Sequence, residues 1–458
     1  MKAIAIIWNS MREHFNEALD DISNDAKIFD ALKINFSDEF NSFISNIYPY
    51  EGDERWKLEY KTNILNRNDQ NLEICILFLD VPDSTLKYVE RKKQYIYENV
   101  EALKQKIRGK YKNIIDFYSY DNVFHMTDNE MAFSKTVLVV KKFLLSLLLK
   151  NRGFICLDDF FIDEKKFIDH NEEHGKRDKF WFANEEFMFK NAKDNTFEIY
   201  SELFADEICR ILGIEVANYF PSTYNSHEGL ITVNFLSSHE ILITANELIS
   251  SFLKHSYNCN NIPIELICKY NNLEDLPKII ENYCINNGLV FTCNIKEELS
   301  KIYAFDTILL QTDRTPNNIG IIINNKTKTA KMSPLYDNSN IMGMNKDKNV
   351  ISNYSLYELY ELPTMLNLSR EDDFFSNKLL NLETINDEDL ILKLNEYIEV
   401  LNSISLEEIF DDVCVKYGID LPSEFKNFMR ENFVIHLQNI ELSLKDSGKS
   451  LNKTKSLI

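Results

Sequence analysis

The stretch QTDRTPNNIGIIINN, residues 311–325, together with SPLYDNS, residues 333–339, indicates the fold of this chain most directly. Within it, the apolar run IGIII, residues 319–323, predicts a short strand, and NNKT after it predicts a turn. The segment TAKM then predicts a returning strand that leads into SPLYDNS. We therefore expect a β-hairpin with polar side chains just before it and just after it.

A helix is expected upstream of this hairpin. Residues 296–310, KEELSKIYAFDTILL, carry apolar side chains on one side of a helix and end where TDRTPNN begins. The helix would deliver Asp313 and Asn318 to a loop, and the hairpin would place Asp337 beside them. Aspartate, asparagine and proline are also common in ordinary turns, so each residue alone carries little information.

These three side chains suit phosphoryl transfer from ATP. An attacking hydroxyl needs a carboxylate that orients it and accepts its proton, a role that fits Asp313. Mg²⁺ on the ATP phosphates needs hard oxygen ligands, which Asn318 and Asp337 offer. Asp313 and Asn318 are five residues apart, which is the spacing in the catalytic loop of protein kinases.

Further features that a kinase needs occur upstream. The alternating segment EFMFK predicts a strand ending in Lys190, which would bind ATP phosphates. Residues 197–212 predict a helix on which Glu202 lies off the apolar side and could face that lysine. Before the strand, Gly175 offers flexible backbone for close approach to phosphate, and Lys179 offers a cation. An edge-strand lysine is the simpler explanation for Lys190. Glu202 competes for its role with other acidic residues of the same helix, Glu198, Asp206 and Glu207.

The later motifs resemble those of the HipA-like serine/threonine kinases, a toxin-type bacterial branch of the kinase fold. The family's loop N-x-D-R-H-x-x-N, followed by glycine, is similar to QTDRTPNN at residues 311–318 and to Gly320 after it. The family's P-x-YD motif is similar to PLYD at residues 334–337. The combination of these two motifs is fairly specific.

The earlier motifs of the family also have counterparts. The family's G-x-x-x-K loop matches Gly175 to Lys179, and its strand lysine matches Lys190. Its helix, with a glutamate, a small residue and a glycine, matches Glu202, Cys209 and Gly213. The resemblance covers about residues 150–458. It implies a Ser/Thr protein kinase that uses ATP and Mg²⁺, with a protein substrate and a small DNA-binding antitoxin as partner.

The chain departs from the family pattern at three positions. Gln311 stands for the loop asparagine, Thr315 for the loop histidine, and His174 for a serine linked with self-phosphorylation. The first two changes keep a second hypothesis open: a kinase-shaped module that binds nucleotide or a partner with little catalysis. A third hypothesis keeps the enzyme but assigns it a small molecule or a lipid head group as acceptor.

The expected fold is an α/β N-terminal domain followed by a bilobal protein-kinase-like (HipA-like) α+β domain with a mainly helical C-lobe. The predicted segments are an α/β domain of unknown role, a kinase N-lobe, a helical C-lobe and a disordered tail, at residues 1–150, 151–245, 246–445 and 446–458. The length of 458 residues fits two to three domains.

The N-terminal segment has its own pattern. Apolar runs at residues 3–8 and 72–79 predict strands, and the periodicity of residues 85–108 and 129–149 predicts helices. One group of side chains there could bind phosphate or a nucleotide, although a solvated helix face and a helix start explain it more simply; it comprises Lys104, Lys106, Arg108, Lys110, Lys112, His125, Asp128 and Glu130.

Composition restricts the partners and the compartment. The net charge of −21 disfavours direct nucleic-acid binding, because the surface repels phosphate. The most apolar segment, residues 136–149, is interrupted by two lysines and is too short to span a bilayer, so a buried helix and no membrane contact are expected. Eight cysteines without a CxxC pair fit reduced thiols in a cytoplasmic protein.

Overall fold

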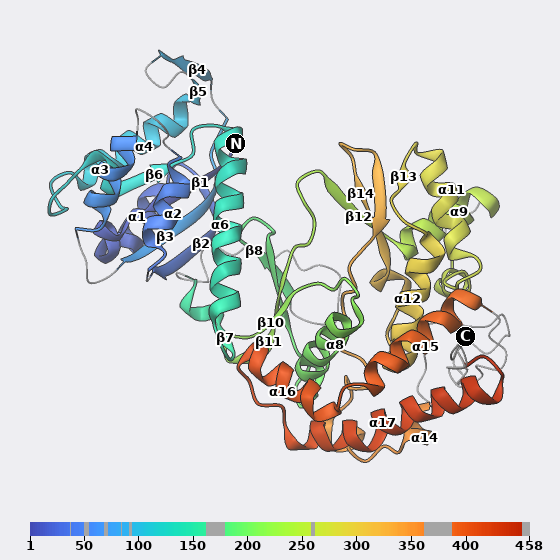
Figure 1. The fold of residues 1–458 in the computed structure, drawn as a ribbon. Helices are drawn as coiled ribbons and strands as arrows, with labels where there is room; N and C mark the ends of the chain where they lie inside the picture. Colours follow the sequence, from blue (N-terminus) through green and yellow to red (C-terminus); the bar gives the residue numbers. More distant parts are fainter. Residues whose placement is uncertain are drawn as a thin grey trace, which may run out of the picture. The chain divides into compact units, whose positions relative to one another are not determined.

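The computed structural model describes residues 1–36, 38–49, 55–67, 72–83, 85–90, 94–161, 179–257, 262–360 and 387–450 (Figure 1). The chain divides into two compact units, Met1–Asn191 with Ser222–Ile231 and Ala192–Pro221 with Thr232–Ile458. The predicted segment boundaries after residues 150, 245 and 445 do not coincide with this division, and they stay predictions. At the level of class, the chain is mixed α/β, with sheets and helices in both units.

The first unit begins with a four-stranded sheet in which neighbouring strands run antiparallel. In spatial order its strands are β2 (Lys27–Phe36), β3 (Leu72–Asp80), β1 (Lys2–Ile7) and β6 (Phe124–Met126). The strands predicted at residues 3–8 and 72–79 are therefore confirmed. Short helices α2 (Phe40–Ile47), α3 (Arg55–Leu65) and α5 (Tyr120–Val123) lie between these strands in the sequence.

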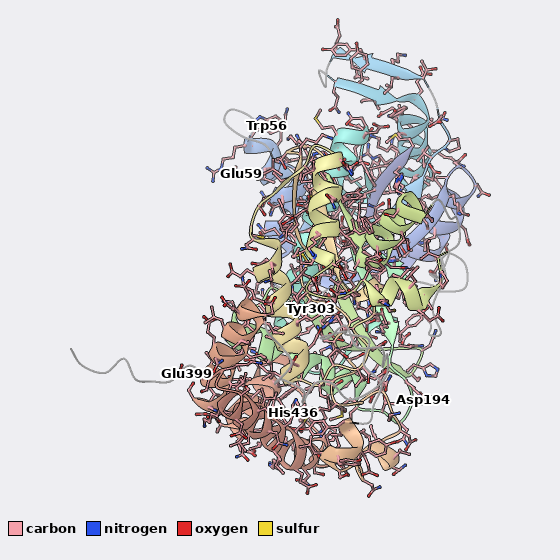
Figure 2. The ribbon with its side chains drawn as sticks, turned by 90° about the vertical axis from the view of Figure 1, so that its right-hand side faces the viewer. Trp56, Glu59, Asp194, Tyr303, Glu399 and His436 are labelled. Atoms are coloured by element: carbon pink, nitrogen blue, oxygen red, sulfur yellow. The ribbon has the colours of Figure 1, made fainter. Side chains whose placement is uncertain are left out.

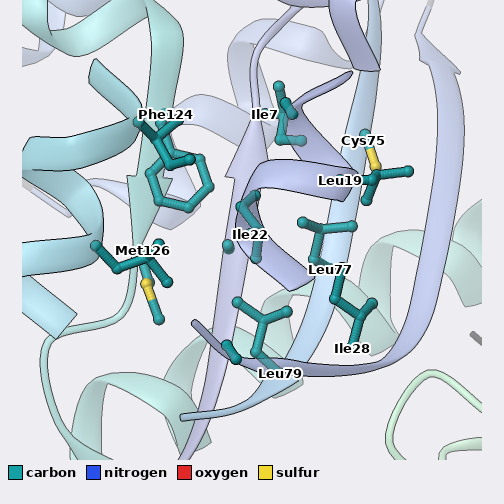
Figure 3. Packing of buried hydrophobic residues seen from close by; sticks show 14 of the residues in the cluster. Ile7, Leu19, Ile22, Ile28, Cys75, Leu77, Leu79, Phe124 and Met126 are labelled. Atoms are coloured by element: carbon teal, nitrogen blue, oxygen red, sulfur yellow. The ribbon is translucent and has the colours of Figure 1, made fainter. Parts of the chain in front are cut away.

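One hydrophobic cluster of this unit lies on one face of the sheet. Helices α1 (Phe15–Ser23) and α4 (Glu98–Tyr111) contribute Leu19, Ile22 and Leu103 to a buried cluster with alternate residues of β1 and β3, part of which Figure 3 shows. Ile4 and Ile6, which alternate with these residues, are also fully buried. Both faces of β1 are covered, which explains its uninterrupted apolar sequence.

The helix predicted over residues 85–108 is wrong in its first half. The structure has a hairpin there, formed by β4 (Leu86–Val89) and β5 (Gln94–Tyr97), and helix α4 begins only at Glu98. Tyr88 and Tyr95 are cross-strand partners whose ring centroids lie 5.2 Å apart. Aromatic and β-branched residues favour strands, and this preference outweighed the helical spacing of the apolar residues.

The helix predicted over residues 129–149 is confirmed as α6 (Glu130–Lys150). The side chain of Asn129 caps it by accepting a hydrogen bond from the backbone amide of Ala132, at 3.0 Å. One face is buried, whereas Leu138 on another face is 63% exposed, so α6 is buried on one side only. No helix within the described residues is long and apolar enough to cross a membrane.

A second sheet in the first unit carries two of the predicted site residues. In spatial order its strands are β7 (Ile155–Cys156), β10 (Tyr219–Tyr224), β11 (His227–Val233), β9 (Phe187–Asn191) and β8 (Lys179–Phe182), of which β10 and β11 extend into the second unit. Lys179 and Lys190 are direct cross-strand partners. Gly229 in β11 passes so close to β9 that a Cβ atom there would lie 2.4 Å from the carbonyl oxygen of Lys190.

The second unit combines one sheet with most of the helices. Its sheet contains β12 (Glu240–Thr244), β14 (Gly320–Asn324), β15 (Thr329–Met332) and β13 (Val290–Phe291). Gly320 lets β14 approach β12, because a Cβ atom there would lie 2.6 Å from the carbonyl oxygen of Ile243. The hairpin predicted after Asp313 is confirmed as β14 and β15.

The helices of this unit come both before and after the predicted site residues Asp313, Asn318 and Asp337 in the sequence. They are α8 (Glu198–Leu212), α9 (Ala245–Tyr257), α10 (Ile264–Lys269), α11 (Leu276–Asn286), α12 (Ile295–Ile308), α13 (Lys348–Ile351), α14 (Leu356–Tyr360), α15 (Glu388–Asn402), α16 (Leu406–Tyr417) and α17 (Ser423–Asp446). The helices predicted near residues 197–212 and 296–310 are confirmed as α8 and α12. Of the predicted tail, residues 451–458 lie outside the described residues.

Candidate active site

The loop that follows α12 is closed by hydrogen bonds to the backbone of Asp313. The side-chain oxygen of Gln311 accepts a bond from the amide of Asp313 at 3.1 Å. The carbonyl oxygen of Asp313 accepts bonds from Nδ2 of Asn318 at 2.9 Å and from the amide of Thr315 at 2.8 Å. A single 3₁₀ turn, Pro316–Asn318, completes the loop. The spacing of five residues thus forms a compact loop in which Asp313 is partly exposed.

The same bonds orient the Asn318 amide. A carbonyl oxygen can only accept a hydrogen bond, so the atom of Asn318 that faces the Asp313 carbonyl must be Nδ2. Oδ1 is therefore the atom of Asn318 that would bind a metal ion. Within the described residues, no group of three or more His, Cys, Asp or Glu side chains could hold a metal ion. The predicted Mg²⁺ ligands are of another kind, one amide and one carboxylate, and such sites are completed by phosphate and water.

Arg314 forms a buried ion pair with Asp306 of α12. Both side chains are fully buried. Nε of Arg314 lies 3.0 Å from Oδ2 of Asp306, and Nη2 lies 2.9 Å from Oδ1. Burial would lower the pKa of Arg314, but the Asp306 carboxylate outweighs this effect and raises the pKa. Arg314 therefore stays charged in the interior, in a two-pronged geometry that suits a guanidinium and a carboxylate.

Arg314 also joins the two predicted metal-binding segments. Its Nη1 donates to the carbonyl oxygens of Asn318, at 3.3 Å, and Tyr336, at 2.9 Å. Its Nη2 donates to Oδ1 of Asn338, at 2.6 Å. The hydroxyl of Tyr336 adds a bond to the carbonyl oxygen of Asn317, at 2.6 Å. Asn318 and the residue before Asp337 thus contact the same nitrogen atom, so their backbones lie close together.

Asp337 has a backbone conformation that aspartate rarely adopts. Its φ is 56°, in the left-handed region. Its amide donates to the hydroxyl oxygen of Tyr219 at 2.9 Å, and the next amide, of Asn338, donates to Oε1 of Glu202 at 2.9 Å. Burial and the nearby carboxylates of Glu202 and Asp337 raise the pKa of Tyr219, which keeps its hydroxyl neutral. Buried side chains thus fix a strained conformation, as is common at functional sites.

The predicted phosphate-binding residues have different outcomes. Glu202 is buried on α8 and contacts the segment of Asp337 through the Asn338 amide. Lys190 and Lys179 belong to the first unit, where they lie opposite each other, so the pairing of Lys190 with Glu202 stays a prediction. Gly175 lies outside the described residues. The second unit therefore brings together Asp313, Asn318, Asp337 and Glu202.

Sequence reasoning missed several residues that shape this site. Asp306, Asn338 and Tyr219 are buried and hold Arg314 and Asp337, but none was predicted. The sequence does indicate that Asp306 is unusual, because it is the lone acidic residue in the apolar run IYAFDTILL. An acidic side chain on the buried side of a helix requires a partner, and Arg314 follows eight residues later.

The basic group of the N-terminal segment is largely neutralised by ion pairs. These pairs are Lys104 with Asp128, Lys106 with Asp25 and Lys110 with Asp21. Arg108 donates two bonds to the carbonyl oxygen of Phe124, at 2.9 and 2.7 Å. Lys104 and Arg108 are buried, so the interpretation as a solvated helix face is wrong for these two residues. The expected helix start is confirmed, since Asn129 caps α6.

His436 of α17, labelled in Figure 2, supports the end of α12. It is fully buried, with Nε2 2.9 Å from the carbonyl oxygen of Thr307 and Nδ1 3.0 Å from the hydroxyl of Tyr360. A neutral imidazole satisfies both contacts, since Nε2–H donates to the carbonyl and Nδ1 accepts from the hydroxyl. Burial lowers the pKa of His436 from 6.5 to about 4.

This pKa predicts a loss of stability in acid. The folded state binds a proton more weakly than the unfolded state, so the contribution of His436 is present above pH 6.5 and declines as the pH falls toward 4. Chemical denaturation at pH 7 and pH 5 should show a decrease of up to about 2 kcal/mol in the wild type from this group, and a smaller one in His436→Gln. His227→Gln, at an exposed histidine, should behave like the wild type. An equal decrease in the free energy of unfolding between pH 7 and pH 5 in all three proteins would contradict this account.

Comparison with known proteins gives structural neighbours only. No protein-family model matches the sequence, and no curated protein matches it. A proinflammatory kinase of Helicobacter pylori, CtkA, is 17% identical, with 62% of this chain and 96% of that chain covered and a TM-score of 0.47. HipA of Shewanella oneidensis MR-1, from a toxin–antitoxin complex with HipB and operator DNA, is 10% identical, with 68% and 72% covered and a TM-score of 0.38. Both TM-scores lie below 0.5, so neither likeness carries an argument about this chain.

Proposed function

We propose that this chain is an ATP- and Mg²⁺-dependent kinase that phosphorylates a serine or threonine hydroxyl of a protein. The observation that carries the proposal is the position of Arg314. One of its nitrogen atoms binds the carbonyl oxygens of Asn318 and Tyr336, so the two polar segments on either side of the β14–β15 hairpin meet. A kinase needs such a meeting, since the base and the metal ligands must surround one triphosphate.

The roles follow from the chemistry of each side chain. Asp313 would orient the acceptor hydroxyl and accept its proton, because it is partly exposed on a loop fixed by Gln311 and Asn318. Oδ1 of Asn318 and the carboxylate of Asp337 would hold Mg²⁺, which when bound neutralises charge on the β- and γ-phosphates. Glu202 holds the Asp337 segment through the amide of Asn338.

Residues of the first unit complete the proposal. Lys190 and Lys179, paired across β8 and β9, would bind the phosphates. The predicted role of Gly175 at the phosphates falls outside the described residues. Glu202 would also hold Lys190. The sequence resemblance adds a toxin role, with an antitoxin protein as partner. The cysteine pattern adds a cytoplasmic location.

Phosphate transfer tests this function directly. Purified protein with Mg²⁺ and γ-labelled ATP should label itself or proteins of a cell lysate. ATP that stabilises the protein against heat without any transfer would favour the nucleotide-binding module that Gln311 and Thr315 suggest. Labelled small molecules in place of labelled proteins, found by mass spectrometry, would redirect the proposal to another acceptor.

Asp337→Asn should separate metal binding from fold. Asparagine tolerates a φ of 56°, so the backbone is kept while the charge is lost. We expect Mg²⁺-dependent ATP affinity to fall by about tenfold or more, measured by calorimetry at several Mg²⁺ concentrations. Asp420→Asn, at an exposed position, is the control. Unchanged Mg²⁺ dependence in Asp337→Asn would remove Asp337 from the metal site.

A further inference from the structure

The turn between β8 and β9 has an unusual backbone. Three consecutive residues, Ala183, Asn184 and Glu185, have φ values of 53°, 58° and 63°, and none of them is glycine. A left-handed conformation costs roughly 1–2 kcal/mol for each such residue. Contacts from outside the turn must therefore favour it over a more relaxed alternative.

The main contact is Asp30 of β2. This carboxylate is 5% exposed, and it accepts hydrogen bonds from the amide of Asn184, at 3.3 Å, and from the amide of Ala183. A β-bulge between Ile28 and Asp30 inserts Phe29 into β2 as an extra residue. Bulges of this kind redirect the side chains that follow them, here the carboxylate that reaches the turn.

Two other elements of the first unit contact the same turn. Nζ of Lys2, the first residue of β1, lies 3.4 Å from Oδ1 of Asn184. Lys141 of α6 forms an ion pair with Glu186 at 2.5 Å. The β8–β9 hairpin is thus attached at its turn to the N-terminal sheet and to α6, and Figure 1 shows α6 beside β8.

The other end of the hairpin carries the two lysines. Its register runs from the pair Phe182–Phe187 at the turn to the pair Lys179–Lys190. Phe182 and Phe187 are stacked with ring centroids 5.5 Å apart, so the hairpin has a packed aromatic face. Each lysine lies three residues along its strand from the Phe182–Phe187 pair, which is about 10 Å. Because the hairpin is short and packed, we expect a displacement of its turn to displace the two lysines at its far end as well.

We propose that Asp30 is a positioning residue for Lys179 and Lys190. It holds the left-handed turn and thereby sets both lysines for binding the phosphates of ATP, so the inference rests on the proposed function. It also gives the N-terminal sheet a role: this sheet is the fixed support of the phosphate-binding hairpin.

The charge of Asp30 gives the inference a distinctive readout. Burial raises the pKa of Asp30 to about 7, against the lowering effect of the amides of Asn184 and Ala183. Other charged groups contact the turn or lie in it. They are Lys2 of β1, Lys141 of α6, and Glu185 and Glu186 of the turn itself. Below pH 7 a proton on Asp30 weakens its acceptance of the two amides, and the turn loosens.

Stability and binding then change in opposite directions with pH. The raised pKa means that the folded state binds the proton more tightly, so the free energy of unfolding falls as the pH rises from about 4 through 7. ATP affinity should instead rise as the pH rises through 7, because the charged carboxylate holds the turn. If Asp30 did not position the lysines, stability would fall in the same way with rising pH, but ATP affinity would not depend on the charge of Asp30.

The experiment compares the full-length wild type, Asp30→Asn and the control Asp25→Asn, an exposed aspartate paired with Lys106. Asp30→Asn should be at least as stable as the wild type at pH 8, because it removes a buried charge. Hydrogen exchange in β8 and β9 should become faster, and affinity for ATP with Mg²⁺ at pH 8 should fall about tenfold and lose its pH dependence. Asp25→Asn should match the wild type in all three measurements.

Two results would overturn the inference: unchanged exchange of the hairpin amides in Asp30→Asn, or faster exchange with unchanged ATP affinity. A wild type that binds no ATP at any pH would instead defeat the proposed function. In that case the exchange measurement still decides whether Asp30 holds the hairpin, so the two failures are distinguishable.

Discussion

Asp306→Asn is expected to lower the free energy of unfolding by about 3–5 kcal/mol, since it leaves a fully buried guanidinium without its charge partner. Arg314 would keep its bonds to the carbonyls of Asn318 and Tyr336, but these neutral groups do not compensate its charge. The two segments that Arg314 joins should loosen as well. Mg²⁺-dependent nucleotide binding should therefore weaken, although Asp306 would not touch the nucleotide.

Urea denaturation of the variant against the wild type measures this effect. Asp411→Asn, at an exposed position on α16, is the matched control and should change stability by less than about 0.5 kcal/mol. The double variant Asp306→Leu with Arg314→Met removes both charges and should be more stable than Asp306→Asn, while still losing nucleotide binding. If Asp306→Asn were as stable as the wild type, the ion pair would not support the fold.

Asp313→Asn should reduce the rate of phosphate transfer by about 10²–10⁴-fold, because the amide cannot accept the proton of the acceptor hydroxyl. The bonds that close the loop use the backbone of Asp313, so the loop should keep its shape. Stability should stay within about 0.5 kcal/mol of the wild type, as expected for a partly exposed side chain.

Single-turnover transfer together with equilibrium ATP binding separates this role from a structural one. A loss of rate with unchanged ATP affinity is the expected result. Asn317→Ala, at an exposed position of the same loop, should retain the wild-type rate, since Asn317 takes part through its backbone carbonyl. Transfer at the wild-type rate in Asp313→Asn would assign the base to another residue.

The sequence was most informative where function depends on local order. The helix, the loop and the hairpin around Asp313 and Asn318 follow from periodicity and turn residues, and the structure has all three. The sequence alone does not decide the role of Arg314, because a guanidinium can support a loop or bind phosphate. Burial decides between these roles in the described structure, and the partners that decide it, Asp306 and Asn338, lie eight and twenty-four residues away.

Contacts between distant segments were the part that sequence could not provide. Asp30 and Asn184 are 154 residues apart, and nothing in either neighbourhood indicates that they meet. The helix prediction for residues 86–97 was wrong for a local reason. Their side chains fit both a helical and a strand periodicity, and cross-strand packing favoured the strands.

The tight passage of β11 past β9 has a consequence for how this chain tolerates genetic change. At residue 229 even alanine would press a methyl group into the carbonyl of Lys190, 2.4 Å away, and the strand that carries this lysine would have to move. One nucleotide substitution at that codon would thus disturb the lysine without altering any polar group. Screens for loss-of-function alleles should find this position beside the expected acidic ones.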